Sequence, residues 1–396
     1  MIQVKAVIGA GYGDEGKGMW TDYLVRNSEK PLVVRNNGGA QVGHTVVREG
    51  QRYIFSHLGS GTLRGVPTLF TRNTVVNPLL FLKETKGRNA GLNPKVYIEN
   101  QAQVTTPFDM LLNQCLEMSR GDVRHGSTGT GFGVTLERVE SGLSLSYKDI
   151  NSGYIFKRLT EIRSWCQNRL PKPSNDFMEQ VAAFFHQNAM VEMFIDDCNE
   201  FCEKTETWKD TFSDYETAIF ENGQGLMLDQ EYGDFPHVTR SNTGFRNIGM
   251  MMKSLGWFNQ VPTQVYYLSR CYTTRHGAGP LPYENHTLPG ICVEDETNKP
   301  NEFQGTLRLA PLNLYAINNA IQWDKVSHPK NAISHKIATC CDHIVKDENA
   351  KYIDRDGKYT ITNSEQFVEK IRQEFNILSY SATGDSLTDW SLARFG

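Results

Sequence analysis

The stretch IGAGYGDEGKGMW, residues 8–20, has the glycine spacing of a phosphate-binding loop: Gly11, four residues, Gly16 and then Lys17. Lys17 stands where such loops place the lysine that pairs with phosphate oxygens. Gly18 stands where they carry the Ser or Thr whose hydroxyl binds magnesium. Because glycine has no side chain, the metal-binding part of this chemistry must come from another residue.

Two carboxylates, Asp14 and Glu15, lie inside the same loop, where negative charge is unexpected beside phosphates. Asp14 is well placed to ligate magnesium, to remove a weakly acidic proton from an acceptor substrate, or to do both. The alternative is that Asp14 only caps the following helix, where Asp is favoured. His44, which follows Gly43, is a second candidate, because an imidazole titrates near physiological pH and can protonate a developing oxyanion. The alternative here is an incidental loop histidine.

Glycine-rich stretches occur at residues 9–18, 36–45, 125–133, 221–229 and 273–280. Several of them follow or adjoin an expected strand, so their backbone amides should converge on one site, as polyphosphates and other oxyanions require. The single polar side chains in or near these stretches are Asp14, Lys17, His44, Ser127, Thr128, Gln224, Thr239 and Arg275.

Short apolar runs bounded by glycine or proline predict the buried strands of a parallel sheet. We expect strands at residues 4–10, 31–35, 67–71, 95–99, 218–222, 264–270 and 331–337. Between the first two, GMWTDYLVRNSEK has helical spacing, with Trp20, Tyr23 and Leu24 on one side. Strand, glycine loop, helix and strand form the βαβ unit in which phosphate lies at a helix N-terminus. The expected fold class is α/β and P-loop-containing, with a mostly parallel central sheet flanked by helices.

The segment 150–215 is rich in charged and aromatic residues and poor in glycine, which indicates a helical insertion in the main domain. Within it, residues 176–204 predict a helix. The tail after residue 345 is predicted as short strands and turns, and it closes with the polar SATGDSLTDWS. Because no repeat or low-complexity linker divides the chain, we expect one domain over residues 1–396.

The composition argues against several classes of protein. The 41 basic and 45 acidic residues give a formal net charge of −4, whereas nucleic-acid-binding proteins usually have a basic excess. No apolar run approaches the roughly 18 to 20 residues that span a bilayer, and the N-terminus lacks the features of a signal peptide. Among the eight cysteines, Cys198 and Cys202 lie one helical turn apart, but no second pair at metal spacing follows. We expect a cytoplasmic protein with reduced thiols that binds neither nucleic acid nor membranes.

Six segments, in order, resemble the motifs of the adenylosuccinate synthetase family. The family's GDEGKG, GGxNAGHT and threonine- and glycine-rich phosphate segments resemble GDEGKG at 13–18, GGAQVGHT at 38–45 and GSTGTGFG at 126–133. Its GAQGTLLD segment resembles NGQGLMLD at 222–229, which is followed by the family-like FPHVTRSNT at 235–243. Its STRVGAGPFPTE segment resembles TTRHGAGPLPYE at 273–284.

The resemblance implies a ligase that condenses L-aspartate with C6 of a 6-oxopurine nucleoside monophosphate. A nucleoside triphosphate would drive the reaction through a 6-phosphoryl intermediate and be hydrolysed to the diphosphate and phosphate. By the same resemblance, Asp14 removes the purine N1 proton, His44 assists as O6 takes the phosphoryl group, and Lys17 offsets charge on that group. Deprotonation makes O6 a nucleophile, and phosphorylation then makes it a leaving group. The resemblance therefore implies a catalytic role for Asp14, the carboxylate inside the loop.

The resemblance also assigns the binding residues. Donor binding is implied for Gly13, Glu15, Gly16, Lys17, Gly18, Gly43, His44 and Thr45. Acceptor-nucleotide binding is implied for Asp14, Gln41, Ser127, Thr128, Gln224 and Thr239, and aspartate binding for Arg275, Gly277, Thr306 and Arg308. Mg²⁺, held by Asp14 and the Gly43 carbonyl, is the implied cofactor, and a homodimer is the implied assembly.

The chain departs from the family pattern at several positions. Gln41 replaces an asparagine, Thr130 stands where many members have an arginine that reaches the nucleotide phosphate, and the arginine cluster around aspartate is reduced to Arg308. Residues 333–337, ISHKI, take the place of the threonine-lysine-leucine-aspartate stretch whose carboxylate selects guanine. Without that acid, guanine's donors lose a partner, so ATP, or either of ATP and GTP, is expected as the donor.

Two acceptors stay open. A viral branch of the family, the 2-aminoadenylosuccinate synthetases, acts on dGMP with ATP-type donors and replaces the loop aspartate by serine, which makes room for the 2-amino group. Asp14 favours IMP, whereas the missing guanine-reading acid and the thinned arginines favour the viral branch, whose site of action would be the host cytoplasm. We favour IMP slightly. A P-loop kinase or NTPase and an inactive nucleotide-binding regulator are remote alternatives, because neither explains the six segments together with Asp14, Lys17 and His44.

Overall fold

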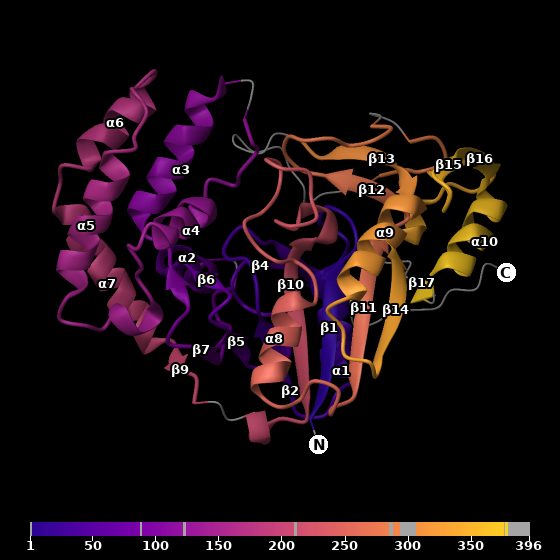
Figure 1. Cartoon of the computed structure of the whole chain (residues 1–396), viewed down its shortest axis with the longest axis horizontal. Helices are drawn as coiled ribbons and strands as arrows, with labels where there is room; N and C mark the ends of the chain where they lie inside the picture. The colour runs from indigo at the N-terminus through magenta and orange to yellow at the C-terminus, as the bar shows by residue number, and fades with distance from the viewer. Residues whose placement is uncertain are drawn as a thin grey trace.

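The computed structural model describes residues 2–87, 89–121, 124–209, 212–284, 288–293, 306–375 and 377–378. Within these residues, the centre is a nine-stranded sheet in the order β17-β14-β11-β1-β10-β2-β5-β7-β9, in which every neighbouring pair is parallel (Figure 1). Its strands are β1 (Gln3–Gly9), β2 (Pro31–Arg35), β5 (Thr68–Phe70), β7 (Val96–Ile98), β9 (Glu206–Thr207), β10 (Thr217–Gly225), β11 (Thr263–Arg270), β14 (Ala332–Thr339) and β17 (Ile377–Leu378). All seven expected strands are present, and the α/β class with a parallel sheet is confirmed.

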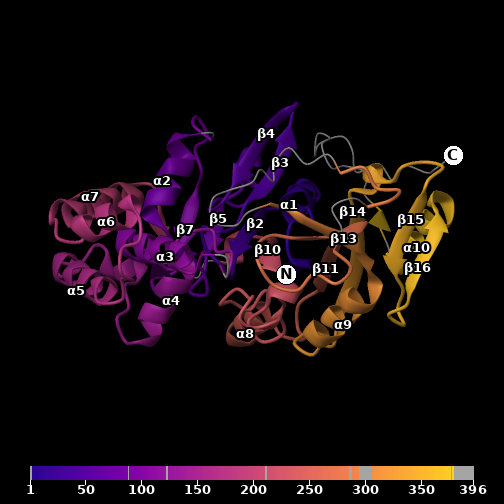
Figure 2. The ribbon, with the colours of Figure 1, turned by 90° about the horizontal axis from the view of Figure 1, so that it is seen from above.

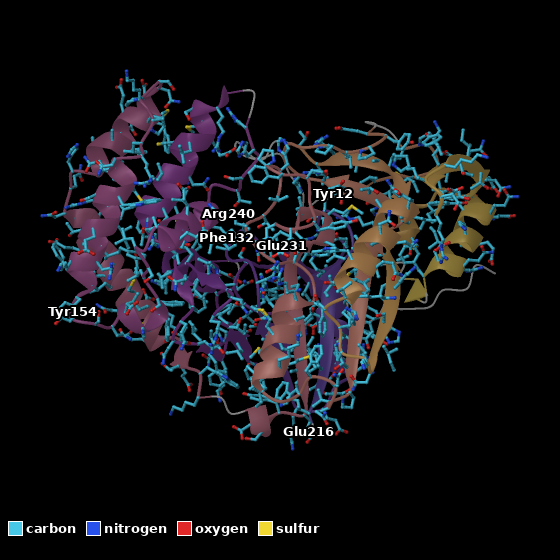
Figure 3. The ribbon with its side chains drawn as sticks, viewed as in Figure 1. Tyr12, Phe132, Tyr154, Glu216, Glu231 and Arg240 are labelled. Atoms are coloured by element: carbon cyan, nitrogen blue, oxygen red, sulfur yellow. The ribbon has the colours of Figure 1, made fainter. Side chains whose placement is uncertain are left out.

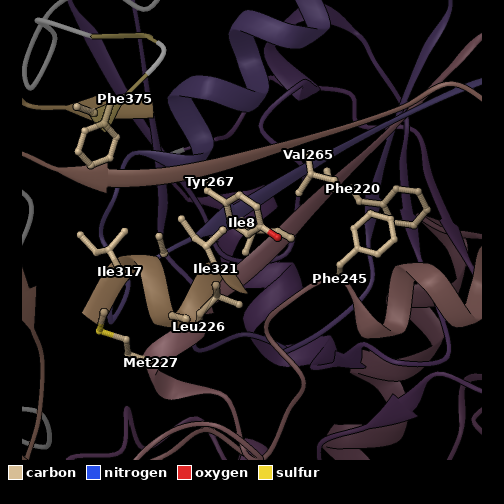
Figure 4. Close-up of a cluster of buried hydrophobic side chains, with 14 of the residues drawn as sticks. Ile8, Phe220, Leu226, Met227, Phe245, Val265, Tyr267, Ile317, Ile321 and Phe375 are labelled. Atoms are coloured by element: carbon tan, nitrogen blue, oxygen red, sulfur yellow. The ribbon is translucent and has the colours of Figure 1, made fainter. Parts of the chain in front are cut away.

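Neighbouring side chains of the central strand β1 pack against helices on opposite faces of the sheet. Ile8 belongs to a core shared with α8 (Arg246–Ser254) and α9 (Leu314–Lys325), which Figure 4 shows against the sheet. Val7 packs on the other face, with α1 (Lys17–Arg26). Because both faces are covered, the strands consist mainly of buried apolar residues, which is the pattern that predicts them.

A second core lies among helices at one end of the sheet, at the left in Figure 1. These helices are α2 (Pro78–Lys86), α3 (Pro107–Ser119), α4 (Phe132–Glu140), α5 (Ile155–Gln167), α6 (Asp176–Phe184) and α7 (Ala189–Glu203). Helix α7 packs against α2 and α5, and α5 packs against α3. The single helix expected over 176–204 is wrong, because the chain breaks between α6 and α7. Phe185 at the break is buried against Phe108, with ring centroids 5.4 Å apart.

The opposite end of the molecule carries a smaller sheet and one further helix (Figure 2). The sheet has the order β12-β13-β15-β16, formed by β12 (Tyr272–Arg275), β13 (Arg308–Asn313), β15 (Asn349–Ile353) and β16 (Tyr359–Asn363). The expectation of only strands and turns after residue 345 is wrong, because α10 (Ser364–Glu374) follows β16. Asn363 caps this helix, and Phe367 and Ile371 are buried one helical turn apart. The closing SATGDSLTDWS lies outside the described residues.

The loops with the candidate chemistry leave one edge of the large sheet. Residues 10–16 follow β1, 36–43 follow β2, 226–229 follow β10 and 340–343 follow β14. Because the carboxyl ends of parallel strands meet at the same edge, these loops are brought together there, where α/β folds bind ligands. Two short pairings complete the fold: the hairpin of β3 (His44–Arg48) with β4 (Gln51–Phe55), and β6 (Val75–Val76) with β8 (Gln103–Val104).

None of the helices in the described ranges is long and apolar enough to cross a membrane. The eight cysteines are free thiols.

Candidate active site

A cavity of about 790 Å³ opens at this edge of the sheet, with α3 and α4 forming part of its wall. Tyr12, Phe132 and Arg240, labelled in Figure 3, belong to its lining. It brings together the predicted residues Gly13, Asp14, Glu15, Gly16, Lys17, Gly18, Gln41, Gly43, His44, Thr45, Ser127, Thr128, Gln224, Thr239 and Arg275. Gly277, Thr306 and Arg308 are described but are not part of the lining.

The carboxylate of Glu15 is bound within the phosphate-binding loop. It accepts hydrogen bonds from the backbone N–H groups of Gly11 at 3.0 Å and Gly13 at 2.8 Å, and from Lys17 Nζ at 2.6 Å. Gly9 leaves room for this ion pair, since a Cβ there would lie 2.3 Å from Glu15 Oε2. A phosphate at these donors therefore competes with Glu15 for them.

Asp14 does not cap α1, because the N-cap residue is Gly16 and no side chain bonds there. Its backbone has a positive φ of 61°, and its carboxylate, 28% exposed, lies with Oδ2 at 3.1 Å from Nε2 of His276. Burial raises the pKa of Asp14, but the hydrogen bond and charge of His276, with Arg270 and Lys17, lower it overall to about 2. Asp14 is thus ionised at neutral pH and able to accept a proton or bind a cation. His276 was not among the residues predicted from sequence.

His44 is held from behind by a buried carboxylate. Its Nδ1 lies 2.7 Å from Oε1 of Glu221. The other oxygen of this carboxylate, Oε2, accepts the backbone N–H of Ser60 at 3.0 Å and lies 3.8 Å from Nη1 of Arg35. Its Nε2 is buried and has no hydrogen-bond partner within the described part of the chain. Burial lowers the pKa of His44, although Glu221 acts to raise it. One ring nitrogen is therefore fixed, and the other is a buried atom, unbonded within the described ranges, of a residue that lines the cavity.

Glu221 is a functional candidate that the sequence reading missed. The available signal was a single charge inside the apolar strand predicted at 218–222, a position that is fully buried in β10. A carboxylate is rarely buried without a partner, so a strand charge of this kind predicts a paired side chain nearby.

Gly18 leaves the space that His44 needs. A Cβ at residue 18 would lie 2.8 Å from the Cβ of His44 and 3.0 Å from Oγ of Ser60. The Ser or Thr of an ordinary phosphate-binding loop would therefore collide with the histidine and its support. Glycine at position 18, which removes the metal-binding hydroxyl, is therefore what leaves room for His44.

Two glutamines that line the cavity have buried polar side-chain atoms without a partner in the part of the chain that the structure describes. Both amide atoms of Gln41 and Oε1 of Gln224 have no hydrogen-bond partner among the described residues. They converge beside Gly38, where a Cβ would lie 3.2 Å from Gln224 Oε1 and 3.5 Å from Gln41 Nε2. Gln224 also adjoins Gly13, the residue before Asp14. Because buried polar atoms are costly unless bonded, this wall favours a ligand with a polar edge.

The predicted acceptor hydroxyls bond to one another or to a neighbour. Thr128 and Thr130 share a hydrogen bond of 2.8 Å between their hydroxyls, and Ser127 Oγ accepts from Asn113 at 2.9 Å. Thr130, where many family members have an arginine, thus adds a hydroxyl to the wall that Thr128 and Thr239 line.

The predicted aspartate-binding arginines are bound to the backbone. Arg275 donates to two backbone carbonyls at 2.7 and 2.9 Å. Arg308 pairs with Glu284 and donates to the carbonyl of Gly277 at 2.9 Å. Thr306 is exposed. The structure brings Arg308 and Gly277 together outside the cavity lining, and the aspartate-binding role of this group stays a prediction.

The segment predicted to read the donor base lies inside a strand. Residues 333–337 belong to β14, which ends at Thr339, and these residues do not line the cavity. Cys340 and His343, after the strand, do line it. Residues 333–337 thus lie outside the cavity lining, whereas the segment after the strand contains an exposed acid, Asp342, between two residues that line the cavity. Because Asp342 supplies an acid in this segment, the argument that a missing acid favours ATP over GTP does not hold.

Oxygen donors that suit Mg²⁺ lie at the predicted positions. The ionised carboxylate of Asp14 and the backbone of Gly43 both line the cavity. No cluster of three or more His, Cys, Asp or Glu able to hold a metal occurs in the described ranges. This donor set fits Mg²⁺, which in phosphoryl-transfer sites takes most of its ligands from phosphate and water.

The family model described as adenylosuccinate synthetase matches residues 6–323. The curated adenylosuccinate synthetases of Streptomyces griseus, Picrophilus torridus and Microcystis aeruginosa are 30%, 31% and 33% identical over 72%, 71% and 70% of this chain. The matched parts cover 66%, 65% and 62% of these relatives, so the chain spans less than two thirds of their length.

Two solved structures share the fold. Fully ligated adenylosuccinate synthetase from Plasmodium falciparum has a TM-score of 0.64 at 19% identity, covering 90% of this chain and 82% of that one. The cyanophage S-2L succinoaminodeoxyadenylate synthetase PurZ, bound to dGMP and to dATP as an energy donor, has a TM-score of 0.58 at 13% identity, covering 97% and 95%. At these identities the likeness establishes the fold alone. The family model covers most of the chain, and this protein therefore belongs to the adenylosuccinate synthetase family.

Proposed function

We propose that this chain is a C–N ligase that joins L-aspartate to C6 of a 6-oxopurine nucleoside monophosphate. A nucleoside triphosphate is consumed and released as diphosphate and phosphate. The observation that carries the proposal is that Asp14, Lys17 and His44 line one cavity, beside the unbonded amide atoms of Gln41 and Gln224.

Asp14 acts as the base in the first step. Its ionised carboxylate lies in the same cavity as Gln41 and Gln224 and removes the N1 proton of a purine bound against these glutamines. The electron pair moves to O6, which attacks the γ-phosphorus while the bond to the bridging oxygen breaks and the diphosphate leaves. Lys17 offsets charge on the transferred group. Asp14 and the Gly43 carbonyl would hold magnesium, which would supply charge neutralisation on the phosphates when bound.

His44 stabilises the charge that develops during this transfer. The lowered pKa of His44 favours a neutral ring, in which Nδ1–H donates to Glu221. An anionic triphosphate favours the imidazolium form, in which both ring nitrogens donate. Nε2–H then points to a developing oxyanion while Glu221 holds the opposite side of the ring.

The second step exchanges oxygen for nitrogen at C6. The amino group of aspartate attacks C6, and the C6–O6 bond breaks as phosphate leaves with O6. One proton from the amine and the proton held by Asp14 pass to solvent. The product is a purine nucleotide that carries a succinylamino group at C6.

We propose IMP as the acceptor and dGMP as the second candidate. Asp14 supports IMP, and the reduction of the arginine cluster to Arg308 supports the diverged viral branch. For the donor, Asp342 after β14 offers a carboxylate of the kind that reads guanine, so GTP stands beside ATP.

An acceptor matrix tests this function. IMP, dIMP, GMP and dGMP are each incubated with L-aspartate, magnesium and either ATP or GTP, and succinyl-purine product is followed by mass. We expect product from IMP and phosphate release that requires aspartate. Phosphate release that does not depend on aspartate would indicate a kinase or NTPase. The absence of any phosphate release would indicate an inactive nucleotide binder. Product from dGMP alone would replace IMP with the viral acceptor and leave the ligase chemistry standing.

The packing of Gly18 gives a further expected result. Gly18→Ser should lower aspartate-dependent phosphate release by about a hundredfold, because His44 must move away from the new side chain. Gly153→Ser is the matched control, since a Cβ there meets nothing within 4 Å, and it should leave the rate unchanged. A Gly18→Ser rate within a few-fold of wild type would show that His44 does not depend on this space.

A further inference from the structure

We infer that His276 restricts the acceptor to 6-oxopurines without an amino group at C2. The inference rests on the proposed function, because it concerns the base edge that Asp14 faces. Residue 276 is histidine in TTRHGAGPLPYE, where the family motif STRVGAGPFPTE has valine. The side chain is 20% exposed and lines the cavity, and its Nε2 lies 3.1 Å from Oδ2 of Asp14.

The backbone on both sides of His276 is fixed. Arg275 is buried and donates to two backbone carbonyls. Gly277 has a φ of +73° and packs against Gly126 so closely that a Cβ on Gly277 would lie 3.1 Å from the Gly126 carbonyl oxygen. A Cβ on Gly126 would lie 2.5 Å from the Cα of Gly277. The ring is therefore held at the cavity by two neighbours with little freedom to move.

The carboxylate that His276 contacts is also fixed. Asp14 has a positive φ, and its backbone carbonyl accepts a hydrogen bond from Nε of Arg270. With Asp14 ionised, Nε2–H of His276 donates to Oδ2. The imidazole then takes one lone pair of Oδ2 and fills space beside this oxygen, so a second donor can reach Oδ2 only past the ring.

This geometry separates the two kinds of purine. A 6-oxopurine without a 2-amino group presents one donor on this edge, N1–H, which the remaining oxygen can accept. A guanine presents N1–H and the 2-amino group side by side, and a carboxylate accepts both with one donor on each oxygen. With His276 in place, a 2-amino group directed at Oδ2 meets the imidazole ring that already donates to this oxygen. An unpaired donor of this kind weakens binding substantially.

Equilibrium binding of IMP and GMP tests the inference, because these nucleotides differ only at C2 and binding needs no turnover. Calorimetric titrations would compare wild type, His276→Val and His276→Gln. We expect wild type to bind IMP about tenfold more tightly than GMP, and His276→Val to reduce this preference to about twofold by improving GMP binding. His276→Gln retains an N–H donor for Asp14 and should keep most of the preference.

His125→Val is the matched control, since His125 is an exposed histidine that lines the cavity without bonding to Asp14, and it should leave the IMP-to-GMP ratio unchanged. Three results would overturn the inference: equal or tighter GMP binding by wild type, an unchanged ratio in His276→Val, or no binding of either nucleotide. An unchanged ratio would mean that Gln41 or Gln224 accepts the 2-amino group. If binding is selective and depends on His276 but the acceptor matrix gives no ligase product, the proposed function is wrong and the inference about His276 stands.

Discussion

Replacing Asp14 with asparagine is expected to lower aspartate-dependent phosphate release by at least about a thousandfold. Asparagine keeps the shape of the side chain and tolerates the positive φ of 61° at this position, so the loop should fold as before. The amide cannot take up the N1 proton of the purine, and it brings no negative charge to a cation. The measurement is the initial rate of phosphate release at saturating IMP, L-aspartate and donor.

A matched control separates this loss from a general effect on the fold. Asp347 is an exposed aspartate with a φ of 63°, outside the cavity lining, so Asp347→Asn makes the same change at a similar backbone conformation. We expect it to leave the rate unchanged. Binding of IMP to Asp14→Asn within a few-fold of wild type would show that the cavity is intact. If Asp14→Asn kept a tenth of the wild-type rate or more, another group would have to be the base.

The sheet could be predicted from sequence because its information is local. Each strand is covered on both faces, so a continuous apolar run bounded by glycine or proline marks it. The break between α6 and α7 was not predictable in this way, because residues 176–204 keep helical spacing and the break depends on the contact of Phe185 with Phe108. The sequence does contain a pattern that favours α10, since Asn363 precedes a helical spacing of apolar residues. The neighbouring residues of the tail form strands, which hides this pattern.

The candidate site likewise has parts that local sequence patterns predict and parts that they do not. The glycine loops are local patterns, so the convergence of Asp14, Lys17 and His44 could be expected from sequence. The pairs that tune them are not local: Glu221 lies 177 residues from His44 and reaches it only because β10 lies between β1 and β2. His276 likewise reaches Asp14 only through the fold. The donor-base segment shows a related limit, since an apolar run locates the strand at 333–337 but not Thr339, the residue at which it ends.

Glu221→Gln is expected to lower kcat by about a hundredfold or more while leaving KM for IMP within a few-fold. The carboxylate accepts Nδ1–H of His44 at 2.7 Å, and a neutral glutamine can turn its N–H group toward that nitrogen and favour the wrong tautomer. Glu221 contacts His44 but does not itself line the cavity, so it acts as a positioning residue. Steady-state kinetics with IMP as the varied substrate measure the effect.

Stability and chemistry must be separated in this variant, because Glu221 also lies 3.8 Å from the buried guanidinium of Arg35. Removing its charge takes away the larger of the two carboxylate charges, Glu221 and Glu84, that compensate Arg35, and we expect the free energy of unfolding to fall by about 3 kcal/mol. Glu374→Gln is the control, since Glu374 is a buried carboxylate paired with Arg355 at 2.7 Å, away from the cavity. It should lose stability and keep kcat.

A double mutant then shows whether Glu221 acts through the imidazole. If its only catalytic role is to hold His44, then Glu221→Gln combined with His44→Asn should be no slower than His44→Asn alone, because groups that act as a unit do not lose activity additively. A double mutant slower by the full product of the two effects would give Glu221 a separate role. A Glu221→Gln variant that melts earlier but keeps kcat would make the pair structural, and the chemistry would then rest on Asp14 and Lys17.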